Sequence, residues 1–174
     1  GLVFALDGLA NTWHSTGLLR ADEANHKIMV NSMRGVIDAF YEDVDAPVIV
    51  DKGRGWPIPQ IMQAMTEVVG AKPKIIATVR SIPDCMASFV RVAKPDDLDA
   101  FMESGELSEH LKAAYITLQT GYQYDPECFC LVEYEDLLAD PRSQLDRIHA
   151  FLGLDAFDYD FEAIDGTSVQ EDDE

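Results

Sequence analysis

The spacing of apolar and polar residues predicts three short strands, each followed by a helix. Apolar runs bounded by turn residues occupy Pro47–Asp51, Ile75–Val79 and Cys128–Tyr134, and their lengths are typical of buried strands. Elsewhere the apolar residues recur with helical spacing, in the segments Gly1–Trp13, Asp22–Val44, Ile58–Val69, Pro83–Val92, Leu98–Glu103, Leu107–Tyr122 and Arg142–Leu152.

The order of these elements predicts an α/β fold, a three-layer parallel sheet with helices on both faces. Right-handed crossovers then bring the three strand ends to one edge of the sheet. Three strands are few for such a sheet, so we expect at least one more strand before Gly1. The chain begins at glycine inside an apolar segment, which indicates a start that is processed or truncated. We expect one domain spanning residues 1–174.

Charge narrows the choice of partners. The chain has 13 Lys+Arg against 32 Asp+Glu, a formal charge of −19, and such a field repels nucleic acid and anionic lipid. No apolar run reaches membrane-spanning length and no leader sequence is present, so we expect a cytoplasmic protein. The three cysteines lack metal-binding spacing and fit a reducing cytosol, with Cys128 and Cys130 on one face of a strand as core residues.

The strand ends carry the candidate chemistry. Arg80 follows the second strand, and Ser88 comes eight residues later in the next helix. Ligands of open parallel sheets bind at the carboxyl ends of the strands, where a guanidinium fork and a hydroxyl suit a phosphate. Lys52 follows the first strand, either as a functional cation or as a surface lysine in a turn. Tyr134 ends the third strand, either against a purine or in ordinary packing.

Two segments resemble sulfotransferases that use 3′-phosphoadenosine 5′-phosphosulfate (PAPS), in the branch of the bacterial and tyrosylprotein enzymes. In KIIATVRSIPDCMASF (residues 74–89) the arginine and serine have the separation found in the 3′-phosphate-binding segment of that family. In LVEYEDLLADPRSQLDRIHAFLGL (residues 131–154) a strand ends in Tyr-Glu-Asp-Leu, and a proline and a helix ending in Phe-Leu-Gly follow. The resemblance covers residues 47–154 and implies a fold similar to the P-loop nucleotide hydrolases.

The resemblance also implies roles for individual residues. Arg80 and Ser88 would hold the 3′-phosphate of PAPS, and Tyr134 would lie against its adenosine. Lys52 matches the lysine of an Asp-Lys pair and would stabilise charge as the sulfonate moves. Arg54 could also reach the donor.

Other polar residues receive weaker assignments. His14 is a candidate general base for an acceptor hydroxyl, with a solvated surface histidine as the alternative. Glu135 and Asp136 are assigned to backbone structure, and Asp84 to the first turn of a helix. The chemistry requires no metal. We expect a small-molecule acceptor, neutral or cationic because the protein is acidic.

The chain departs from the family pattern in two places. Nothing in residues 1–20 matches the loop that binds the 5′-phosphosulfate, so we expect that loop to precede Gly1, and residues 1–174 alone to be inactive. The late glycine-rich loop that completes the 3′-phosphate site in the family is also unmatched, unless Asp165–Ser168 is its remnant. Two alternatives therefore stay open: a non-catalytic module that binds nucleotide or protein, and a P-loop-type small-molecule kinase. The kinase would need a Gly-Lys-Ser/Thr loop and a magnesium-binding carboxylate.

Overall fold

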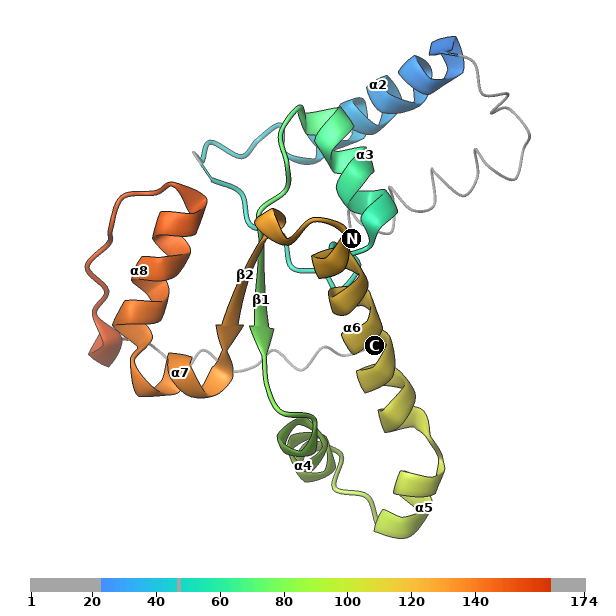
Figure 1. Ribbon diagram of the computed structural model, residues 1–174, viewed down its shortest axis with the longest axis vertical. Helices are drawn as coiled ribbons and strands as arrows, with labels where there is room; N and C mark the ends of the chain where they lie inside the picture. Colours follow the sequence, from blue (N-terminus) through green and yellow to red (C-terminus); the bar gives the residue numbers. More distant parts are fainter. Residues whose placement is uncertain (1–22, 47, 164–174) are drawn as a thin grey trace.

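Helices surround a two-stranded parallel sheet in the computed structural model, which describes residues 23–46 and 48–163 (Figure 1). Strand β1 (Ile75–Val79) pairs with β2 (Phe129–Glu133), so that Ile75 lies opposite Phe129 and Val79 opposite Glu133. The helices are α2 (Glu23–Phe40), α3 (Pro59–Val69), α4 (Ile82–Ala93), α5 (Leu98–Glu103), α6 (Glu106–Tyr124), α7 (Tyr134–Ala139) and α8 (Pro141–Leu152), with 3₁₀ turns at Pro126–Cys128 and Phe161–Ala163.

The two central strands and their helices agree with the sequence pattern. Both predicted apolar runs form strands, the first over residues 75–79 as predicted and the second over Phe129–Glu133. The predicted run of residues 128–134 is one residue too long at each end, because Cys128 closes a 3₁₀ turn and Tyr134 begins α7. The parallel pairing of the two strands confirms an α/β arrangement. In Figure 1, α8 lies on one side of the two strands and α6 on the other. The described residues form two of the three predicted strands, and the larger three-layer sheet stays a prediction. The segment Gly1–Trp13 lies outside the described residues.

The predicted strand at Pro47–Asp51 is wrong over its described part. Residues 48–51 have no regular structure, and Val50 is 81 % exposed. The indole nitrogen of Trp56 donates a hydrogen bond of 2.8 Å to a carboxylate oxygen of Asp51, which ties the end of this segment to the turn at residues 54–57. Apolar, β-branched residues favour a strand, but they do not supply the neighbouring backbone that a strand must pair with.

The helix boundaries follow local signals in the sequence. Helix α4 begins after Ser81, whose hydroxyl accepts from the backbone N–H of Asp84, and Asp84 takes its predicted place in the first turn. Helix α3 ends at Gly70, which adopts a left-handed conformation with φ of 80°. Helix α2 ends at Phe40, four residues before the predicted Val44, and residues 41–43 form a turn.

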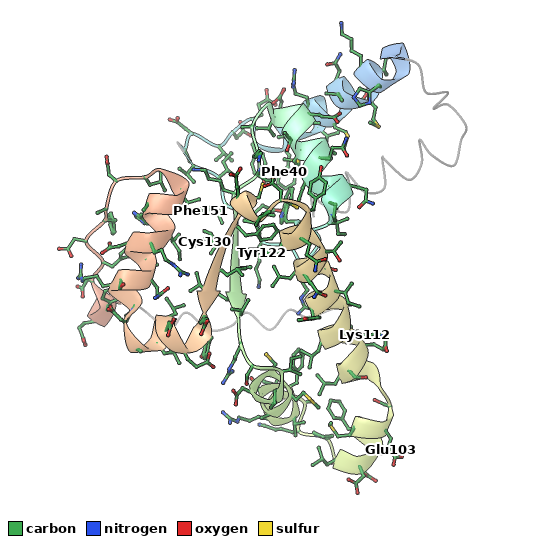
Figure 2. The ribbon with its side chains drawn as sticks, viewed as in Figure 1. Phe40, Glu103, Lys112, Tyr122, Cys130 and Phe151 are labelled. Carbon is green, nitrogen blue, oxygen red and sulfur yellow. The ribbon has the colours of Figure 1, made fainter. Side chains whose placement is uncertain are left out.

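Two apolar clusters support the sheet. Met33 of α2 and Val68 of α3 form the first, and Trp56 packs against it. Met62 of α3, with Cys128 and Phe129, forms the second, beneath the start of β2. The ring of Tyr122 on α6 meets Phe129 edge to face at 5.8 Å between centroids, and Figure 2 shows Tyr122 close to the strands. Val132 in β2 is fully buried.

Lys74 joins the beginning of β1 to the end of α8. Its ammonium donates to the carbonyl oxygens of Phe151 and Leu152, each at 2.8 Å, and lies 5.7 Å from the centroid of the Phe151 ring. Figure 2 labels Phe151 on α8 beside the strands. These carbonyls are among those that a helix leaves without partners at its C-terminus, so the lysine caps α8 from another element.

Within the described ranges, none of the helices has the combination of length and apolar character needed to cross a bilayer.

Candidate functional site

Strand register brings the candidate arginine next to the candidate tyrosine. Val79 and Glu133 are partners in the sheet, so the residues that follow them, Arg80 and Tyr134, emerge at the same edge. The Cζ atom of Arg80 lies 4.5 Å from the centroid of the Tyr134 ring. A guanidinium at this distance from an aromatic face makes a cation–π contact, which restricts the orientation of the arginine. The two residues therefore form one site at the carboxyl ends of the strands.

Arg80 also has an acidic neighbour. Its Nε atom lies 3.6 Å from Oε1 of Glu135, which is longer than a hydrogen bond. The Arg80 side chain is 34 % exposed and that of Glu135 is 57 % exposed, so solvent screens the pair. The guanidinium thus keeps accessible N–H donors although it has a partner.

The sequence pattern did not predict the contact between Arg80 and Glu135. It indicated that Glu135 and Asp136 would stabilise the backbone and would not take part in binding. Among the described residues, neither side chain makes a hydrogen bond to the backbone. The Tyr-Glu-Asp run directly after a strand is the only sequence signal that points to this position. The partner of the Glu135 carboxylate is set by the pairing of β2 with β1, so the Tyr-Glu-Asp run alone does not predict it.

Ser88 lies on the helix that Arg80 leads into. It is half-buried in α4, and its hydroxyl has no hydrogen-bond partner among the described residues. It comes six positions after Ile82, the first residue of α4, which is a rise of about 9 Å along the helix axis. No hydrogen bond joins Arg80 and Ser88, so a shared ligand would have to bridge them.

The two other basic candidates follow the predicted first strand, Lys52 in irregular backbone and Arg54 at the start of a turn. Lys52 and Arg54 are exposed, and neither makes an ion pair with a described residue. Trp56 anchors this turn to the α2–α3 cluster through packing and through its bond to Asp51. No described contact joins the turn to Arg80. The candidate base His14 lies outside the described residues, as does Asp165–Ser168.

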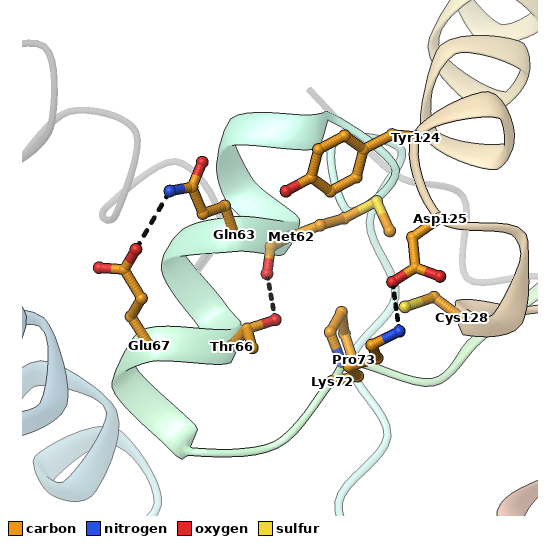
Figure 3. A pocket seen from close by; sticks show the side chains of 9 residues that line it. All are labelled: Met62, Gln63, Thr66, Glu67, Lys72, Pro73, Tyr124, Asp125 and Cys128. Carbon is orange, nitrogen blue, oxygen red and sulfur yellow. Dashed lines mark hydrogen bonds and ion pairs between the residues drawn. The ribbon is translucent and has the colours of Figure 1, made fainter.

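A cavity of about 250 Å³ lies at the opposite ends of the strands, away from Arg80 (Figure 3). Its walls come from α3, from the end of α6 and from the segments that enter β1 and β2, and its lining residues are Met62, Gln63, Thr66, Glu67, Lys72, Pro73, Tyr124, Asp125 and Cys128. It does not contain any of the predicted site residues. The sequence gives no signal for this cavity, because its lining residues come from distant segments that meet only in the folded protein, at the amino ends of the strands.

Charges at this cavity are paired with one another. Lys72 contacts Asp125 at 2.7 Å and Glu127 at 3.1 Å, and these hydrogen bonds raise the pKa of the lysine. The bond from Lys72 lowers the pKa of Asp125. Burial, followed by the nearby Asp125 carboxylate, raises the pKa of the Cys128 thiol. The described residues contain no group of three or more His, Cys, Asp or Glu side chains arranged to hold a metal ion.

Comparison with known protein families finds a match over most of the chain. A family model described as "Sulfotransferase family" matches residues 21–159, which include β1, β2, Arg80, Ser88 and Tyr134. No curated protein and no solved structure matches the chain significantly.

Proposed function

The chain belongs to the sulfotransferase family, and on that premise we propose that it transfers a sulfonate group from PAPS to a hydroxyl or amine of a small-molecule acceptor. In this reaction the bond between sulfur and the phosphate oxygen of the donor breaks. A bond between sulfur and the acceptor oxygen or nitrogen forms, and the acceptor loses a proton. The second product is adenosine 3′,5′-bisphosphate, which keeps the 3′-phosphate.

The contact between Arg80 and Tyr134 is the observation that carries this proposal. A guanidinium with accessible donors suits a phosphate monoester, and an aromatic ring beside it suits a purine. Both lie at the carboxyl ends of parallel strands, where ligands of open α/β sheets bind. Arg80 would bind the 3′-phosphate and Tyr134 the adenosine.

Ser88 would add a hydroxyl donor to the 3′-phosphate from the next helix. Its half-buried hydroxyl is not engaged by a described residue, so it is free to bind a ligand oxygen. The donor set of Arg80 and Ser88 contains only N–H and O–H groups, which matches a phosphate that is almost fully ionised at neutral pH.

Sulfonate transfer places negative charge on the departing phosphate oxygen, and a cation near that oxygen lowers the barrier. Lys52 would supply this cation, and Arg54 could assist it. Both are exposed and lack acidic partners in the described part of the chain, so their charges are not neutralised locally. His14 is the candidate for the base that accepts the proton of the acceptor.

The surface charge supports a proposal about the acceptor. At −19 the protein repels anions at long range, so a neutral or cationic small molecule would approach more readily than an acidic one. The anionic donor must then be bound by a local positive group, which is the role proposed for Arg80.

Calorimetry with three nucleotides tests the donor assignment. We expect adenosine 3′,5′-bisphosphate to bind without metal and more tightly than adenosine 5′-phosphate. Preferential binding of ATP with magnesium would indicate a kinase instead. A screen for bisphosphate release from PAPS, run on the full-length protein with a panel of neutral, cationic and acidic acceptors, then separates an enzyme from a module that binds nucleotide without turnover.

A further inference from the structure

The arginine proposed to bind phosphate already has a carboxylate beside it. From this contact we infer that Glu135 is an internal competitor for Arg80, which weakens retention of the 3′-phosphorylated nucleotide and speeds its release. The inference rests on the proposed function and goes beyond it, because it assigns a role in specificity and release to a residue that would not bind the nucleotide.

Two consecutive residues of α7 hold Arg80 in different ways. The ring of Tyr134 contacts the guanidinium through its face, with Cζ at 4.5 Å from the ring centroid. The carboxylate of Glu135 lies nearest to Nε, at 3.6 Å. The ring is uncharged and can stay in place when a phosphate arrives. The carboxylate carries the same sign of charge as the phosphate, so it must move away or raise the energy of the complex.

Glu135 has the freedom that a competitor needs. Its side chain is 57 % exposed, and it makes no hydrogen bond to another described residue. Ion pairs between exposed side chains are weak because solvent screens them, so a phosphate can displace the carboxylate at little cost. Glu135 is also the only described carboxylate that pairs with Arg80. Asp84, in the adjacent helix, instead accepts a hydrogen bond from the hydroxyl of Ser81.

Competition of this kind changes the release of product more than the chemical step. The donor and the bisphosphate product both keep the 3′-phosphate, so the Arg80 contact is present before and after transfer. An interaction that is equal in the ground state and the transition state does not raise the chemical rate, and it slows departure of the product. A carboxylate that returns to Arg80 offsets part of this contact and lets the bisphosphate leave sooner.

The test compares Glu135→Gln with wild type by calorimetry, using adenosine 3′,5′-bisphosphate and adenosine 5′-phosphate. The bisphosphate should bind about two- to fivefold more tightly to Glu135→Gln, which is the upper part of the range for a lost exposed ion pair. The affinity for the 5′-phosphate should stay unchanged, since this ligand does not reach Arg80 through a 3′-phosphate. The gain should shrink as salt is added.

Asp136→Asn is the matched control, because it makes the same change of charge one residue along α7 at an exposed position without an ion pair to Arg80. It should leave the affinity for the bisphosphate nearly unchanged. Thermal unfolding of both variants checks that each folds as wild type does.

Each result separates the inference from the proposed function. If wild type fails to bind the bisphosphate, the proposed function is overturned and this inference with it. If wild type binds it and Glu135→Gln binds it equally or more weakly, only the role of Glu135 is overturned. Equal gains in Glu135→Gln and Asp136→Asn, or a gain for the 5′-phosphate, would show a general effect of charge and overturn competition for Arg80.

Discussion

Arg80 packs its guanidinium against the ring of Tyr134 although 53 residues lie between them in the sequence, because the parallel register of β1 and β2 aligns the residues that precede them. A pair that is set by strand register is held by the backbone of the sheet. The arginine can therefore be changed without removing the element that positions the tyrosine.

Replacing Arg80 with alanine should weaken binding of adenosine 3′,5′-bisphosphate by about 1.5–3 kcal/mol, roughly ten- to a hundredfold, because hydrogen bonds to a charged phosphate are lost. The fold should be retained, since the side chain is partly exposed and its ion pair is loose. Calorimetry measures the affinity and thermal unfolding the stability. Arg91→Ala, an exposed change on the last turn of α4, is the control and should keep the affinity. Equal affinities for Arg80→Ala and wild type would remove the central assignment.

Replacing Lys52 with alanine should lower the rate of sulfonate transfer by about a hundredfold or more, while the affinity for the bisphosphate product changes little. The reason is that Lys52 is proposed to act on the departing oxygen and makes no contact with Arg80. Initial rates of transfer and product inhibition, both measured on the full-length protein, report the two effects separately. Lys112→Ala, on the exposed side of α6, removes the same charge at a distant position and should leave both unchanged. A Lys52→Ala protein with the wild-type rate would refute this role.

Gly121 is required where α6 meets the turn before α3. A Cβ atom at this glycine would lie 2.1 Å from the carbonyl oxygen of Pro57, closer than atoms can approach. Gly121→Ala should therefore lower the free energy of unfolding by about 1–3 kcal/mol, as overpacked sites do. In Gly35→Ala the new Cβ meets no atom within 4 Å, and this helical position should become more stable by about 0.5–1 kcal/mol. Denaturant titration of both variants tests the contrast, which fails if they change in the same direction.

The cysteines should differ in reactivity. Cys128 is 3 % exposed, and burial followed by the Asp125 carboxylate raises its pKa above the ordinary value of 9.0. Cys85 is half-buried, so a maleimide should label it before Cys128 at pH 7–8. Mass spectrometry of the labelled protein identifies which cysteine has reacted. Above pH 9 the unfolded chain ionises Cys128 more readily than the folded chain, so its contribution to stability is lost as the pH rises. Labelling of Cys128 before Cys85 in the folded protein would contradict this order.

Local patterns in the sequence were enough to locate most elements. The apolar runs at β1 and β2 and the helical spacing of α3, α4, α5 and α8 match the structure closely, because each combines periodicity with clear start and stop residues. The strand predicted at Pro47–Asp51 failed because apolar composition does not specify a partner for its backbone. The Arg80 and Ser88 spacing correctly placed the arginine at a strand end and the serine in the following helix.

Contacts between distant segments were harder to predict. The meeting of Arg80 with Glu135 depends on the register of two strands, and no spacing along one segment encodes it. The same holds for the cavity around Met62 and Cys128, which forms where α3, α6 and two strand entrances converge. Such sites emerge only when the elements are assembled.

The lysine that caps α8 has a mechanical consequence. Lys74 lies directly before Ile75, so the last turn of α8 and the first rung of the sheet share one anchor. Fraying of that helix end and opening of that rung should then occur as a single cooperative event, and backbone amides in the two places should exchange with deuterium at matching rates.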